Sequence, residues 1–218
     1  MNFEAAREQV VHTCIELADR GYLAGTGGNV AIRVDAEHFA VTPSALDYYA
    51  MTPDDVCIVR LSDGVQVEGA RQASVESGLH AAVLRARPDS GACIHTHQPV
   101  ASAYSLLGRP LVVCDEARRQ VLGERVPYVE YAPSGTAWLA MRVAAVFEHG
   151  DRACVMRNHG IVCVGIDTAE AAQRVRSLEA ECATQLLESL GEALPKATTA
   201  PVRTLLEESL RNHEEPDE

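Results

Sequence analysis

Apolar residues recur along this chain with two different spacings, and each spacing predicts a kind of secondary structure. Phe3, Ala6 and Val10 stand three or four positions apart, which predicts an amphipathic helix over residues 3–20. Similar spacing, together with capping residues and prolines, predicts five more helices. They cover residues 74–87 (with Ser74 as N-cap), 99–107, 135–148, 167–190 and 202–211.

Short apolar runs bounded by turn residues predict strands. They cover residues 30–34, 38–42, 57–61, 65–68, 92–96, 111–114, 153–156 and 161–164. Several are joined by tight turns, so the sheet should be largely antiparallel. The charged stretch 115–119 is typical of a solvated loop. We therefore expect an α+β fold in three layers (α/β/α), with helices flanking a largely antiparallel central sheet.

The chain shows no internal repeat and no clear internal boundary. Residues 1–195 are expected to form a single domain, and residues 196–218 a C-terminal helix and an acidic tail. Within this end of the chain, residues 195–201 read as a linker, and residues 214–218 as a disordered tail.

Composition narrows the function classes. Apolar residues make up 47% of the 218 residues, ample for a core, and the net charge of −12 argues against a nucleic-acid partner. No apolar run is long enough to span a membrane, and the first residues lack the features of a signal peptide, so we expect a cytoplasmic protein. The seven cysteines form no Cys-x-x-Cys pair, and most of them read as small buried apolar residues.

The strongest candidate for chemistry lies at the end of the 92–96 strand. Side chains two positions apart share a face of a strand, so His95 and His97 should point the same way and could bind a divalent metal. His159, before another apolar run, is a candidate third ligand. Alternatively, His95 is a buried histidine and His97 a surface one.

Two further features are ambiguous. The loop Gly25-Thr-Gly-Gly-Asn29 could present main-chain N–H groups to an anion or be a plain tight turn. Glu76 and His80 share a helix face. Glu76 could simply favour the positive end of that helix, and His80 reads as a packing residue or as one that supports metal ligands.

Taken together, five ordered stretches resemble the class II aldolase/adducin family, and most closely its fuculose-1-phosphate aldolase branch. The resemblance runs from about residue 3 to residue 190. The matching stretches are Gly25-Thr-Gly-Gly-Asn29-Val30, Thr42-Pro-Ser44, Ser74-Val-Glu76 with His80, His95-Thr-His97, and Asn158-His-Gly160.

The resemblance implies a metal-dependent lyase that cleaves a ketose phosphate, such as L-fuculose 1-phosphate, to dihydroxyacetone phosphate and an aldehyde. His95, His97 and His159 would hold one zinc ion, or else manganese or iron, and Glu76 would be the catalytic acid/base. The residues implied to bind the substrate phosphate are Gly28, Asn29, Ser44 and Ser74. The family also implies a homotetramer with the site at a subunit interface.

Four positions depart from the family pattern. Val75 replaces a serine and Ala45 replaces a glycine, and both changes weaken the expected phosphate site. Glu116, beside Asp115, stands where the branch has a tyrosine from a neighbouring subunit that acts as the distal acid. Asp115 and Glu116 are therefore candidate catalytic carboxylates. Ser134 replaces an aromatic residue.

Other activities stay open on the same metal site. They are 4-epimerisation of a pentulose phosphate, dehydration and decarboxylation of a sugar phosphate. The epimerase branch typically has an aspartate in place of Glu76, although the carboxylates of Asp115 and Glu116 fit it. A non-catalytic, adducin-like interaction protein is a third class, but such relatives lack the metal histidines.

Overall fold

The computed structural model describes residues 2–193 and 196–214. Its centre is an eight-stranded sheet with the order β4-β3-β2-β1-β5-β10-β9-β8. Every neighbouring pair is antiparallel except β8 and β9, which are parallel. The strands are β1 Asn29–Arg33, β2 His38–Val41, β3 Cys57–Arg60, β4 Gln66–Glu68, β5 Ala92–Thr96, β8 Tyr128–Val129, β9 Ala153–Met156 and β10 Gly160–Gly165. A separate two-stranded sheet pairs β6 Leu111–Val112 with β7 Arg125–Val126.

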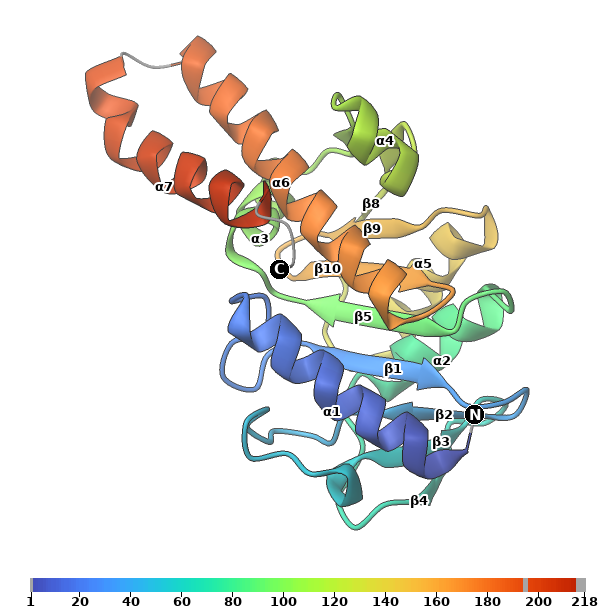
Figure 1. Ribbon diagram of the computed structural model, residues 1–218. Coiled ribbons are helices and arrows are strands. Elements are labelled where there is room, and N and C mark those ends of the chain that lie inside the picture. Colours follow the sequence, from blue (N-terminus) through green and yellow to red (C-terminus); the bar gives the residue numbers. More distant parts are fainter. Residues whose placement is uncertain (1, 194–195, 215–218) are drawn as a thin grey trace.

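Helices cover both faces of the large sheet. They are α1 Phe3–Asp19, α2 Ser77–Ala86, α3 Pro99–Tyr104, α4 Glu116–Leu122, α5 Ala137–Glu148, α6 Thr168–Ala193 and α7 Lys196–Glu214, with short 3-10 turns at Pro53–Asp55 and Ser105–Leu107. Helices α1 and α6 cross one face and α2 and α5 lie on the other (Figure 1). None of these helices is long and apolar enough to cross a membrane.

Alternation along the central strands separates two cores. Ile94 packs in the layer that contains Leu17 and Leu178, while its neighbour Cys93 packs in the layer that contains Leu79. All five side chains are buried, and Ile94 and Cys93 lie on opposite faces because successive residues of a strand point to opposite sides. The predicted three-layer α/β/α fold with a largely antiparallel sheet is confirmed.

The predicted N-cap of the second helix is wrong by two residues, because Glu76 and not Ser74 precedes the helix. Helix α2 begins at Ser77, because the chain before it is extended and pairs with the segment that follows β2. The Ser74 N–H donates to the carbonyl of Thr42 at 3.0 Å. The Ser74 hydroxyl instead accepts a hydrogen bond from the N–H of Glu76 at 3.3 Å, so Ser74 braces the turn that carries Glu76.

The prediction of a solvated loop at 115–119 is also wrong. The segment forms the start of α4, and Asp115 caps it by accepting a hydrogen bond from the N–H of Arg118 at 2.8 Å. Leu122 is buried at the other end, and Gly123 ends the helix with a φ of 91°. The cap at Asp115 and the buried Leu122 stabilise a helix in this charged stretch.

The predicted linker at 195–201 is wrong over residues 196–201, because α7 already begins at Lys196 and continues through Pro201. Helix α7 lies alongside α6 and buries Leu206 (Figure 1). The stabilisation from this packing outweighs the loss of the main-chain hydrogen bond that Pro201 cannot donate. Glu214, the first residue of the predicted tail, is the last residue of α7, and residues 195 and 215–218 lie outside the described residues.

Candidate metal centre and active site

His95 lies in β5, between the neighbouring strands β1 and β10, and its side chain is fully buried. Its Nδ1 is 2.7 Å from the carbonyl oxygen of Ile161. A carbonyl can only accept, so Nδ1 carries the proton and donates it. The Nε2 of His95 is therefore left with a lone pair that can bind a metal.

His97 lies just beyond the end of β5 and turns its ring back toward His95. The two Nε2 atoms are 2.9 Å apart, and the ring centroids are 4.6 Å apart. The prediction that both rings share one side is confirmed, although His97 is exposed and His95 is buried. The buried side chain of Gln98 anchors the next turn: it accepts from the Thr96 hydroxyl and donates to the Val175 carbonyl in α6.

His159 comes from the turn between β9 and β10. Asn158 has a φ of 52°, a left-handed conformation that asparagine tolerates better than most residues, and this bends the turn toward β5. Gly160 then passes so close to β5 that an added Cβ would lie 2.2 Å from the carbonyl oxygen of Thr96. The resulting centroid distance between the rings of His159 and His95 is 4.8 Å.

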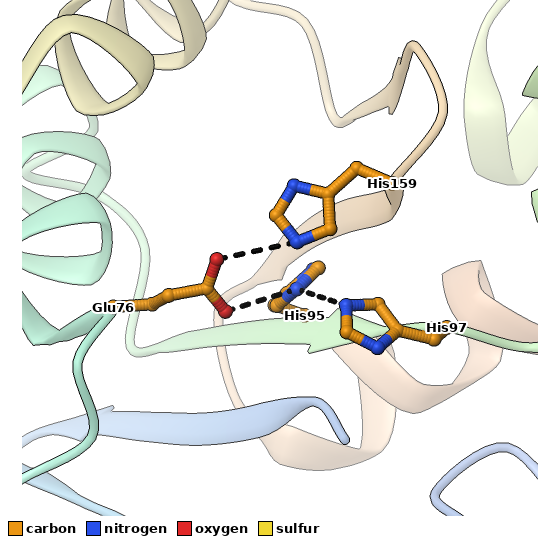
Figure 2. Close-up of side chains that lie close together, drawn as sticks. All are labelled: Glu76, His95, His97 and His159. Carbon is orange, nitrogen blue, oxygen red and sulfur yellow. Dashed lines mark hydrogen bonds and ion pairs between the residues drawn. The ribbon is translucent and has the colours of Figure 1, made fainter. Parts of the chain in front are cut away.

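Glu76 approaches the histidines from the turn before α2, as Figure 2 shows. Its Oε2 is 3.1 Å from His95 Nε2, and its Oε1 is 3.3 Å from His159 Nε2. Burial acts to raise the pKa of this carboxyl, but the contacts with the imidazoles of His159 and His95 and the hydrogen bond from Asn29 outweigh burial and hold the pKa far below its ordinary value. Glu76 is therefore a buried, ionised carboxylate.

This set of side chains fits a divalent cation. One ligand atom from each of Glu76, His95, His97 and His159 can be chosen so that all lie within 4.8 Å of one another. Imidazole nitrogens and a carboxylate are ligands that zinc commonly takes in proteins. Partial burial of the His97 ring, together with the neighbouring imidazoles of His95 and His159, lowers its pKa to about 4, so a proton is disfavoured there at neutral pH and a metal ion would meet less competition.

Two side chains donate hydrogen bonds to the Glu76 carboxylate, and a third supports one of them. Asn29 Nδ2 donates to Oε2 at 3.0 Å, and the Ser134 hydroxyl donates to Oε1 at 2.8 Å. His80 contacts Asn29 from α2. The contact of Ser134 was missed in the sequence, because 58 positions separate it from Glu76 and no local pattern marks the residue.

Most of the residues implied to bind phosphate lie near this centre. Gly28 has a φ of 90°, and an added Cβ would lie 2.7 Å from the carbonyl oxygen of His95, so the loop needs glycine there. Ser74 braces the turn before Glu76. Ser44 lies on the turn after β2, with its N–H on the Gln72 carbonyl at 2.8 Å. Ala45, next to it, has a left-handed φ of 52°, a conformation that favours glycine.

Asp115 and Glu116 are not part of this cluster within one chain. Asp115 caps α4, and Glu116 accepts hydrogen bonds from Arg119 and Gln120 on the same helix. Helix α4 packs against α6 and β7. Among the described residues, neither carboxylate has a hydrogen bond or an ion pair with the four metal-centre side chains.

Comparison with known proteins identifies the family. The family model of the class II aldolase and adducin N-terminal domain matches residues 8–186. The chain belongs to this family. It is 33% identical over 170 residues to an L-fuculose phosphate aldolase of Methanococcus maripaludis (strain C7), covering 78% of this chain and 89% of the relative.

Two more relatives support this membership. The chain is 31% identical over 196 residues to a 5-methylthioribulose-1-phosphate/5-deoxyribulose-1-phosphate aldolase of Rhodospirillum rubrum, covering 90% of this chain and 86% of that one. A solved structure of an L-fuculose 1-phosphate aldolase superposes with a TM-score of 0.81 at 26% identity, over 95% of each chain. The resemblance inferred from the five sequence stretches is confirmed.

Proposed function

We propose that this protein is a metal-dependent aldolase that cleaves a ketose 1-phosphate to dihydroxyacetone phosphate and an aldehyde. The observation that carries the proposal is the meeting of one buried, ionised carboxylate, Glu76, with three imidazoles at a single point. The R. rubrum relative and the solved structure are named for ketose 1-phosphates with different remaining carbons, namely 5-deoxyribulose derivatives and fuculose. We therefore assign a ketose 1-phosphate as the class of substrate and leave the remaining carbons open.

His95, His97 and His159 would hold the metal, with zinc as our first choice and manganese or iron as alternatives. When bound, the ion supplies Lewis-acid stabilisation where negative charge develops on the substrate oxygens. Neutral imidazoles suit this task, because they leave the positive charge of the ion uncompensated. The hydrogen bond from His95 to Ile161 keeps that ring in the orientation that metal binding needs.

Glu76 would move the proton at the reacting carbon. Cleavage breaks the bond between C3 and C4, turns the C4 hydroxyl into an aldehyde and leaves the electron pair on the dihydroxyacetone phosphate half. One proton leaves the C4 hydroxyl and one is added at C3, so the reaction consumes no acid or base overall. In the direction of condensation, the ionised Glu76 is the base that removes the C3 proton.

The proton of the C4 hydroxyl needs a second group. We assign it to Glu116 or Asp115 of a neighbouring subunit in a homotetramer, because neither carboxylate reaches the centre within its own chain. Both sit at the start of α4, where Arg118 anchors the helix to the buried Glu181 at 3.0 Å. A carboxylate so placed could accept the hydroxyl proton.

Gly28, Asn29, Ser44 and Ser74 would bind the phosphate. Gly28 and Asn29 adjoin His95 across the β1–β5 pairing, and Ser74 lies two residues before Glu76.

We also assign the protein to the cytoplasm. The support is that all seven cysteines are unpaired, as expected in a reducing compartment.

The experiment is release of dihydroxyacetone phosphate from L-fuculose 1-phosphate and from 5-deoxyribulose 1-phosphate, followed with a coupled reductase. Zinc-loaded protein should release it from at least one substrate. His159→Ala should lose both zinc and turnover, which controls for contaminating aldolase. No release from fully metal-loaded protein would contradict the aldolase proposal and favour an epimerase, dehydratase or decarboxylase.

A further inference from the structure

Two buried polar side chains form a chain of hydrogen bonds that ends on Glu76. Asn29 Nδ2 donates to Glu76 Oε2 at 3.0 Å, and the other end of the same amide, Oδ1, lies 2.5 Å from His80 Nε2. Asn29 belongs to β1 and His80 to α2, and all three side chains are buried. This chain therefore links the central sheet and a helix to the carboxylate.

The direction of every hydrogen bond in this chain follows from the orientation of the Asn29 amide. Glu76 Oε2 accepts a hydrogen bond from the Asn29 NH₂ group, so the Asn29 carbonyl oxygen faces His80. That oxygen also only accepts, so His80 Nε2 must carry a proton and donate it. The reverse orientation of the amide would place two acceptors against each other.

The far nitrogen of His80 supports the same assignment. His80 Nδ1 is buried and has no hydrogen-bond partner among the described residues. A proton there would be a buried donor without an acceptor, which is costly. Burial also lowers the pKa of His80 to about 3. The ring is thus neutral and has its single proton on Nε2.

We propose that His80 is a positioning residue for Glu76 and acts through the amide of Asn29. The inference rests on the proposed function of Glu76 and adds a role that the local sequence does not show. The Nε2–H of His80 locks the Asn29 amide, so that an N–H always faces Glu76 Oε2. Ser134 holds the other oxygen at 2.8 Å, so both oxygens are fixed separately. One N–H of Asn29 stays available for a substrate oxygen.

The test compares two substitutions of His80 in zinc-loaded protein. His80→Leu removes the donor, whereas the amide of His80→Gln can donate from nearly the position of Nε2. The leucine variant should lose about tenfold in kcat, the loss that one ordinary hydrogen bond accounts for. Its KM and zinc content should be unchanged, and the glutamine variant should keep kcat within about twofold. Full activity in both variants, or equal loss in both, would overturn the proposal.

A second measurement does not depend on turnover. In the ¹⁵N NMR spectrum of zinc-loaded protein, His80 should have a protonated Nε2 and a bare Nδ1. Asn29→Ala should shift the Nε2 signal, because it removes the acceptor, while Ser134→Ala, which removes a hydrogen bond to Glu76 and none to His80, should leave it in place. An unchanged signal in Asn29→Ala would contradict the proposed chain of hydrogen bonds from His80 through Asn29 to Glu76. If the signal shifts but the unmodified protein cleaves no ketose phosphate, the chain of hydrogen bonds from His80 to Glu76 is supported and the proposed function fails.

Discussion

At the scale of single residues, the metal centre depends on a few positions with strict backbone requirements. The strand period predicted that His95 and His97 share one side, and the structure confirms it. The approach of His159 depends on Gly160, which has no room for a side chain against β5. The contacts of Glu76 with Asn29 and Ser134 could not be predicted, because they join residues that are 47 and 58 positions apart and carry no periodic pattern.

Gly160→Ala should therefore remove the metal without touching any ligand. The added Cβ would meet the carbonyl oxygen of Thr96 at 2.2 Å, so the turn must move away from β5 and take His159 with it. Zinc content, measured by mass spectrometry of purified protein, should fall at least tenfold. Gly78→Ala is the matched control, because nothing lies within 4 Å of that position and alanine suits a helix. Normal zinc content in Gly160→Ala would show that His159 does not depend on this close approach.

At the scale of elements, buried acidic residues of α6 hold neighbouring helices in place, among them α3, which follows β5. Glu179 accepts hydrogen bonds from the N–H groups of Val100 and Ala101 at 2.9 and 2.8 Å, at the start of α3. Most helices and strands were predictable from spacing, because each buries one face. Helix α4 and the start of α7 were not predictable in this way, because their composition is typical of loops. A capping residue stabilises α4, and packing against α6 stabilises α7.

Glu179→Gln should destabilise the protein by about 1–3 kcal/mol, because one of the two N–H groups loses its acceptor in a buried place. Since α3 directly follows the turn of His97, zinc affinity should fall as well. Urea unfolding and a competitive zinc titration would measure both effects. Glu188→Gln, an exposed position on the same helix, should change neither. Equal stability of the two variants would mean that Glu179 does not anchor α3.

At the scale of the whole molecule, the buried neutral histidine couples folding to pH. Burial lowers the pKa of His80 to about 3, whereas an unfolded histidine has a pKa of about 6.5. Between these values the unfolded chain binds a proton that the folded chain does not. His80 therefore costs stability as the pH falls from about 6.5 to about 3, by up to about 1.4 kcal/mol per pH unit.

Urea unfolding of metal-stripped protein at several pH values would check this dependence. The free energy of unfolding should fall less steeply with acid in His80→Gln than in the unmodified protein, because glutamine does not titrate. Metal must be absent, since loss of zinc in acid would add its own pH dependence. Parallel curves would show that His80 is already protonated in the folded state.

The central claim is that a carboxylate held beside three metal-binding imidazoles performs the proton transfer. The most direct measurement is kcat together with zinc content for Glu76→Gln, a substitution that keeps the shape of the side chain and removes its charge. The account predicts one zinc ion per subunit and a loss of at least about a hundredfold in release of dihydroxyacetone phosphate, the usual contribution of an acid/base residue. Full turnover by the zinc-loaded variant would contradict it.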